Sequence, residues 1–169
     1  DLSPNGGREI YTALRKLATK SEIVGRIGII TPYNKDLTKT VYAGADISLV
    51  PSKFEPCGLV VPSSIVNGTV PIGRKVGGIA DIIKNGRNGF LFSCDWPTDT
   101  HSTLLASNKL LQKIVTANTM FQNKSLWRPF VEGLLKEDHS WNLAAKEYEK
   151  LYRITLEQFK NNERSSMFS

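Results

Sequence analysis

Cysteine and histidine are scarce in this sequence, with two residues of each among 169. Cys57 and Cys94 form neither a CxxC pair nor the cysteine and histidine spacing that is typical of zinc sites. A disulfide framework and a metal site are therefore not expected, and both cysteines are interpreted as free thiols. His101 and His139 are interpreted as structural or exposed residues.

Long apolar runs are also lacking, since none reaches the roughly 18 residues that a membrane-spanning helix needs. The opening residues, DLSPNGGREI, do not have the basic and then apolar pattern of a signal peptide. With 40% hydrophobic and 22% charged residues, the composition is typical of one globular domain. We therefore expect a soluble, intracellular chain with no membrane partner.

Basic residues exceed acidic ones, giving a net charge of +6, but they are not clustered. The longest basic clusters are pairs, such as those at 15–16 and 74–75. This spread argues against nucleic acid as a partner and favours an anionic small molecule. A solvated basic surface without any partner remains the alternative.

Helical and strand patterns alternate along the first hundred residues. Helices are predicted over 8–19, 35–45, 59–67 and 79–85, and short apolar strands over 26–31, 46–50, 69–73 and 88–92. Such alternation predicts an α/β fold, namely a Rossmann-like parallel sheet with helices on both faces. Because no strand precedes the first helix, the sheet is expected to begin upstream of Asp1.

From about residue 99 onward the sequence predicts only helices, over 98–118 and, as a long C-terminal helix, over 140–160. Residues 1–160 are interpreted as one domain and residues 161–169 as a polar tail. Trp96, Trp127 and Trp141 could form a sugar-stacking surface, but core or edge packing is favoured for them.

Residues 51–57 form the loop after the strand predicted at 46–50, and ligands of open α/β sheets bind at such carboxyl ends. Gly58 permits a close backbone approach, and the following helix offers unpaired N–H groups that suit a phosphate. Glu55 would be repelled by that phosphate, so its carboxylate is expected to face sugar hydroxyls or a cationic transition state. A sugar nucleotide satisfies both requirements. The alternative is that Glu55 only caps a turn or pairs with Lys53.

A second turn of this kind follows the next predicted strand. Gly77 and Gly78 open a helix, with Arg74 and Lys75 in front of them. A glycine pair alone is most often only a turn, but two adjacent sites of this type favour a ligand-binding edge more than one does.

These residues lie in a longer segment, ADISLVPSKFEPCGLVVPSSIVNGTVPIGRKVGGIADII at 45–83, which closely resembles the signature of bacterial glycogen synthases and plant starch synthases. GFLF at 89–92 and HSWNLAAKEYEKLY at 139–152 are similar to further motifs of that family. The resemblance extends from Gly7 to Tyr152.

The resemblance implies the C-terminal, donor-binding domain of a GT-B glycosyltransferase. Members of this family transfer glucose from a nucleotide sugar, usually ADP-glucose, to the non-reducing end of an α-1,4-glucan with retention of configuration. UDP-glucose stays open as the donor, no metal or other cofactor is implied, and the compartment is plastid or cytoplasm. The family also implies an N-terminal, acceptor-binding domain as a partner, without which this fragment should be inactive.

The same resemblance assigns roles to individual residues. It implies that Glu55 is the catalytic residue facing the donor glucose, and that the backbone at Cys57, Gly58 and Leu59 holds the sugar and the distal phosphate. Tyr33 is expected to stack on the nucleotide base, with ordinary packing as the alternative. Gly77 and Gly78 are expected to shape the sugar pocket.

Some positions depart from the family pattern. Lys53 replaces an arginine, Val76 replaces a threonine, and Val60, Val61 and Pro62 replace a more polar stretch. Two alternatives therefore stay open. One is a retaining GT-B enzyme of other donor or acceptor specificity, such as a sucrose- or trehalose-type synthase. The other is a non-catalytic regulatory or glucan-binding module.

Overall fold

The computed structural model describes residues 7–166, and the chain divides after Gly44 into two compact units. No helix in the described part of the chain is long and apolar enough to cross a membrane.

The first unit contains helix α1, Gly7–Ala18, and helix α2, Lys35–Gly44, which confirm the two helices predicted there. The strand predicted at 26–31 is wrong, because residues 27–31 pair with no other strand in the described part of the chain. A strand needs a partner for its backbone N–H and C=O groups, and an apolar run alone does not supply one. Neither helix of this unit has a buried residue.

The second unit contains a parallel sheet, which within the described residues has three strands in the order β1-β2-β3. They are β1, Ile47–Val50; β2, Val70–Arg74; and β3, Phe90–Phe92. Leu49 lies opposite Ile72 across the first pair, and Ile72 opposite Phe90 across the second. The strands predicted at 46–50, 69–73 and 88–92 are thereby confirmed.

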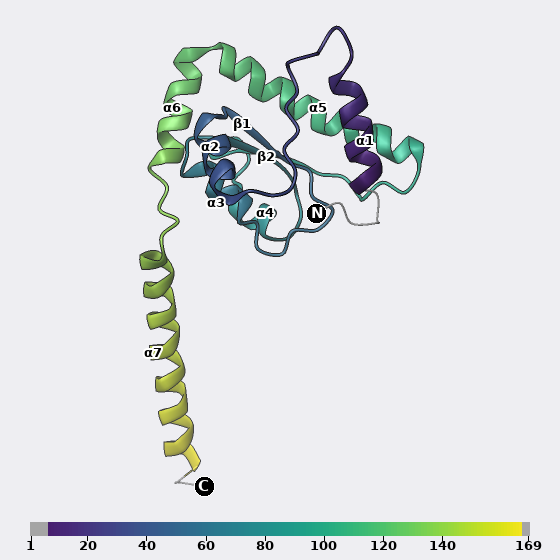
Figure 1. Cartoon of the computed structure of the whole chain (residues 1–169). Helices are drawn as coiled ribbons and strands as arrows, with labels where there is room; N and C mark the ends of the chain where they lie inside the picture. Colours follow the sequence, from purple (N-terminus) through teal and green to yellow (C-terminus); the bar gives the residue numbers. More distant parts are fainter. Residues whose placement is uncertain (1–6, 167–169) are drawn as a thin grey trace. The chain divides into compact units, whose positions relative to one another are not determined.

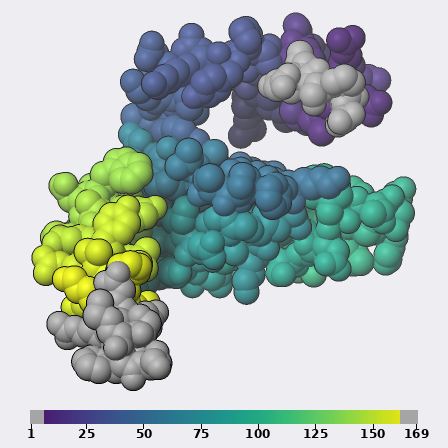
Figure 2. Space-filling view, turned by 90° about the horizontal axis from the view of Figure 1, so that it is seen from below, coloured from purple at the N-terminus to yellow at the C-terminus, as the bar shows by residue number. Residues whose placement is uncertain are grey.

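Helices cover this sheet on both faces, as predicted for a Rossmann-like fold (Figure 1). Helices α3, Val60–Ile65, and α4, Gly77–Ile82, pack against the sheet and each other. Helix α5, Thr100–Gln122, packs against β2 and β3, and α6, Lys124–Leu135, packs against α5. In Figure 2 the teal segments from α4 to α5 form one closely packed mass.

The core lies between the sheet and these helices. Strand β2 is buried at every residue because it is the central strand and both its faces are covered. Ile65 of α3, Ile79 of α4 and Leu134 of α6 are fully buried beside it. Trp127 belongs to the same core, so the packing predicted for this residue is confirmed.

The C-terminal helix α7, Trp141–Ser166, begins where predicted but continues six residues beyond position 160. The polar segment from 161 is therefore helical as far as Ser166. The packing expected for Trp141 is wrong, since this side chain is 81% exposed. Its apolar neighbours on α7, such as Tyr148 and Leu151, are exposed as well. Helical spacing showed which residues share a face, not whether another element covers it.

Candidate functional site

The loop from Pro51 to Leu59 joins β1 to α3 and carries Glu55. Glu55 is half-buried, and within residues 7–166 its carboxylate accepts one long hydrogen bond, from the Ser52 hydroxyl at 3.4 Å. The ion pair with Lys53 is absent from the described part of the chain. The Glu55 carboxylate is thus only loosely held by neighbouring side chains.

Backbone contacts fix this loop against the turn that follows β2. A Cβ atom on Gly78 would lie 2.5 Å from the Cys57 carbonyl carbon, and one on Gly58 would lie 2.8 Å from that of Gly78. Gly77, at φ +41°, packs equally closely against the Glu55 carbonyl. The Gly78 amide donates to the Glu55 carbonyl oxygen at 2.9 Å. We call these contacts of Gly58, Gly77 and Gly78 with the backbone of residues 55–58 the glycine seam.

The glycine seam gives these three glycines a structural role that the sequence did not indicate. The close backbone approach predicted at Gly58 exists, but the group that approaches is the chain's own turn at Gly78. Gly58 also has φ +65°, a conformation that favours glycine. All three glycines therefore allow the two loops at the carboxyl end of the sheet to touch.

The start of α3 leaves amide groups free. No side chain caps this helix, and within residues 7–166 the amides of Leu59 and Val60 donate to no other group of the chain. Pro62 is the third helical residue, where a missing N–H costs no intrahelical bond, as predicted. The start of α4 differs, because the Gly78 amide is already bound to Glu55. The amides of Gly77 and Ile79 donate to no other group within residues 7–166, so both predicted anion sites keep free amides.

Arg74 is the last residue of β2. Its place before the glycine pair suggested a contact with a ligand, but its side chain is not available for one. Its side chain is 7% exposed. Nε donates to the Ser52 carbonyl and Nη1 to the Cys94 carbonyl, each at 2.9 Å, and Nη2 donates to the Lys53 carbonyl. We call this set of three bonds the arginine clamp. Sequence reasoning missed it, although an arginine ending a wholly apolar central strand is a signal, since buried charges need partners.

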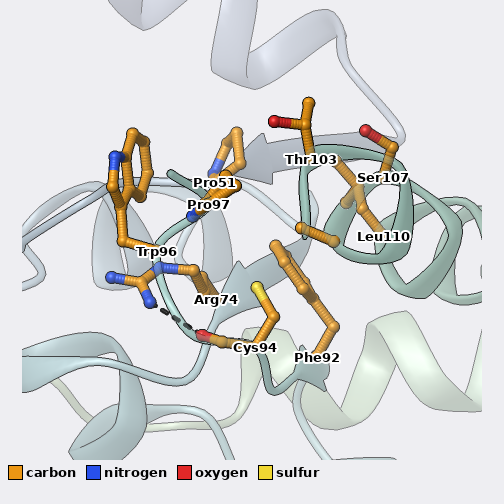
Figure 3. Close-up of a pocket in the computed structure, with 10 residues that line it drawn as sticks. Pro51, Arg74, Phe92, Cys94, Trp96, Pro97, Thr103, Ser107 and Leu110 are labelled. Carbon is orange, nitrogen blue, oxygen red and sulfur yellow. Dashed lines mark hydrogen bonds between the residues drawn. The ribbon is translucent and has the colours of Figure 1, made fainter. Parts of the chain in front are cut away.

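A small hollow lies beside the clamp, with a volume of about 160 Å³ (Figure 3). Trp96 stands at its edge, 43% exposed, and the Lys53 ammonium and Arg74 guanidinium each lie 5.5 Å from its ring centroid. The Lys53 cation thus faces an aromatic ring. The remaining lining residues come from the ends of the strands, the loop after β3, and α5: Pro51, Phe92, Cys94, Pro97, Thr103, Ala106, Ser107 and Leu110.

Helix α5, which forms one wall of this hollow, begins with a capping box. The Asp99 carboxylate accepts a hydrogen bond from the Ser102 backbone amide at 2.7 Å, and Ser102 Oγ lies 3.2 Å from the Asp99 amide. The bonds from the Ser102 amide and then the Ser102 hydroxyl lower the pKa of Asp99 below its ordinary value.

The second unit brings together six of the seven predicted site residues. Glu55, Cys57, Gly58, Leu59, Gly77 and Gly78 all lie at the carboxyl ends of β1 and β2, and Cys57 and Leu59 are exposed. Tyr33 belongs to the first unit, where it is exposed, so its role beside the others stays a prediction. Within the described residues no group of three or more His, Cys, Asp or Glu side chains could hold a metal ion.

A parallel sheet with helices on both faces and loops gathered at its carboxyl end defines an α/β domain, and the solved structures that resemble it are GT-B glycosyltransferases. Residues 6–113 match the family of glycosyl transferases group 1. The chain belongs to this family.

Glycogen and starch synthases are among the proteins that are similar to this chain. A glycogen synthase of Desulfitobacterium hafniense is 38% identical over 135 residues, covering 76% of this chain and 27% of that protein. The catalytic domain of starch synthase IV from Arabidopsis thaliana, solved with ADP and acarbose, has a TM-score of 0.68 and 26% identity, covering 92% of this chain and 31% of that one.

A more distant structure is that of HepE from Anabaena, solved with UDP-glucose. It has a TM-score of 0.53 and 20% identity, covering 78% of this chain and 32% of that one, and supports the fold alone. The present chain spans 27% to 30% of the length of the first curated relatives. The resemblance to glycogen and starch synthases is thus confirmed for a segment of such proteins.

Proposed function

We propose that this chain is the donor-binding part of a glucosyltransferase that elongates an α-1,4-glucan. In this reaction the bond between C1 of the donor glucose and the distal phosphate oxygen breaks, and the nucleoside diphosphate leaves. C1 bonds to the 4-hydroxyl oxygen of the acceptor end, and the proton of that hydroxyl passes to the departing diphosphate oxygen. Retention of configuration is proposed because the sequence resembles a family of retaining enzymes.

The observation that carries the proposal is the placement of Glu55 beside the start of α3. Free amides of Leu59 and Val60 and a half-buried carboxylate lie at one edge of the sheet. Amides with no acceptor suit the oxygens of a diphosphate. The Glu55 carboxylate lies near these amides. Phosphate would repel it, but it would stabilise the positive charge that develops on a glucosyl group.

The proposed roles follow this geometry. Glu55 faces the glucose, while the backbone at Cys57, Gly58 and Leu59 holds the sugar and the distal phosphate. Gly77 and Gly78 shape the sugar pocket through the seam, since the Gly78 amide is already bound to the loop. Tyr33 stacks on the base.

ADP-glucose is the proposed donor, with UDP-glucose as the alternative. A starch synthase similar to this chain was solved with ADP, and a more distant glycosyltransferase with UDP-glucose. Transfer is proposed to need a second, acceptor-binding domain, because such chemistry depends on groups from both sides of a closed cleft that excludes water. The chain by itself is therefore expected to be inactive.

The test is Glu55→Gln in the full-length protein that contains this chain, assayed with ADP-glucose and a maltooligosaccharide. This change removes the charge and keeps the shape, so kcat should fall by about 100-fold or more. Glu132→Gln, at an exposed position on α6, is the matched control and should keep wild-type activity. Full activity of Glu55→Gln would exclude the proposed role of this residue.

Calorimetry with ADP separates the remaining alternatives. Binding of ADP to wild type and to Glu55→Gln with similar affinity is expected, since the amides of α3 are unchanged. A full-length protein that binds neither ADP nor UDP would be the non-catalytic module. Activity with UDP-glucose alone, or release of a disaccharide in place of a longer glucan, would indicate the related enzyme of other specificity.

A further inference from the structure

We propose that Arg74 is a positioning residue for Glu55. It does not touch the donor, and it fixes the loop from which the Glu55 carboxylate extends. The inference rests on the proposed function for the role of Glu55, and goes beyond it by naming the group on which the orientation of that carboxylate depends.

The first step is the geometry of the clamp. Arg74 is the last residue of the central strand, and its backbone lies opposite Phe92 of β3. Its guanidinium donates to Ser52 and Lys53 in the loop after β1 and to Cys94 in the loop after β3. One side chain therefore ties two loops to the strand between them.

The second step is that only arginine suits this position. A charge that is 7% exposed must find partners, and within the described residues no carboxylate pairs with Arg74. Three backbone carbonyls take its donors, and Trp96 lies against the guanidinium. A planar group with five N–H donors can serve several acceptors at fixed angles, whereas an ammonium group cannot.

The third step connects the clamp to Glu55. The clamped carbonyls belong to Ser52 and Lys53, three and two residues before Glu55, and the glycine seam holds the Glu55 carbonyl itself. The loop is thus fixed on both sides of Phe54. Within residues 7–166 the Glu55 carboxylate accepts a single hydrogen bond, of 3.4 Å, so its position depends chiefly on the backbone that carries it. A shift of about 1 Å in a reacting group can cost about 100-fold in rate.

The experiment is a double-mutant cycle of Arg74→Lys and Glu55→Gln in the full-length protein, with ADP-glucose as the donor. Arg74→Lys should lower kcat by about 10-fold to 100-fold, and change the Kd for ADP by less than about 3-fold. In the Glu55→Gln background the same change should lower kcat by less than about 2-fold, because the group that it positions is already disabled. A merely structural role would lower activity equally in both backgrounds, and would overturn the proposal.

Control variants keep the result interpretable. Arg128→Lys, at an exposed position on α6, should leave kcat unchanged. If Arg74→Lys does not fold, Trp96→Leu carries the test, since it removes the ring against the guanidinium at a partly exposed position. It should lower kcat by about 3-fold to 10-fold in wild type and have no further effect with Glu55→Gln. Unchanged kcat in Trp96→Leu would then count against the clamp.

The two proposals fail in different ways. If Glu55→Gln keeps full activity, the proposed role of Glu55 is wrong. Arg74 then has no catalytic carboxylate to position, and the second proposal is wrong as well. If Glu55→Gln is inactive and Arg74→Lys is as active as wild type, the proposed function stands and only the positioning role is wrong.

Discussion

Two attachments hold the loop that carries Glu55, and they differ in kind. The glycine seam is backbone against backbone, made possible by the absence of side chains at Gly58, Gly77 and Gly78. The arginine clamp is a single long side chain that reaches three carbonyls. The seam fixes how closely the two turns approach, and the clamp fixes where the first half of the loop lies.

The difference predicts different consequences of substitution. A Cβ added within the seam meets backbone atoms, which cannot rotate away, so the strands and helices attached to them must shift. A change in the clamp adds no atom that clashes with the backbone, so the loop still folds. It shifts the exact position of the loop. The seam should therefore control stability, and the clamp should control rate.

The largest effect is expected from Gly78→Ala. Its Cβ would lie 2.5 Å from the Cys57 carbonyl carbon, so the free energy of unfolding should fall by about 3 kcal/mol. Urea denaturation measures it. The matched control is Gly133→Ala in α6, where an added Cβ meets nothing within 4 Å. This substitution should raise the free energy of unfolding by about 0.5 to 1 kcal/mol. Equal stability of Gly78→Ala and wild type would show that the seam is not rigid.

A smaller loss is expected from Asp99→Ala, which removes the cap of α5 without touching either attachment. The folded pKa of Asp99 is lowered, so its ionised form adds stability that is complete above the ordinary aspartate pKa of about 4. This contribution should disappear as the pH falls through the lower folded pKa. The difference in Tm between wild type and Asp99→Ala should therefore shrink in acid.

Asp99→Asn serves as the control for that pH dependence, because asparagine also accepts the Ser102 amide but does not titrate. Its difference from Asp99→Ala should stay constant across the same pH range. A difference between wild type and Asp99→Ala that grows toward low pH would contradict the assignment of the cap.

The smallest effect is expected from Lys53→Ala. This residue serves the clamp through its carbonyl, which alanine keeps, while its exposed ammonium only lies over Trp96. The free energy of unfolding should change by less than about 0.5 kcal/mol, as for most surface substitutions. The kcat of Lys53→Ala should be compared with that of Arg74→Lys. A larger loss of kcat in Lys53→Ala would assign the role of positioning Glu55 to the Lys53 cation.

Much of the second unit could be predicted from the sequence. Short apolar strands and turns placed β1, β2, β3 and the starts of α3 and α4, and Glu55, Gly58 and Gly78 do lie at one edge of the sheet. The strand expected at 26–31 could not be judged in this way, because pairing depends on a neighbouring strand that an apolar run does not reveal. The exposure of Trp141 was missed for a similar reason, since a helical pattern does not specify a partner.

By itself, the sequence determined the three strands and most helices of the second unit, but not α6, and it determined which loop carries the carboxylate, because local spacing and turn residues act over a few positions. Only the tertiary structure decided that Arg74 is a buried clamp and that the glycines contact each other's loops. Those contacts join residues about 20 apart in sequence, and they form only once parallel pairing brings the ends of β1, β2 and β3 to one edge.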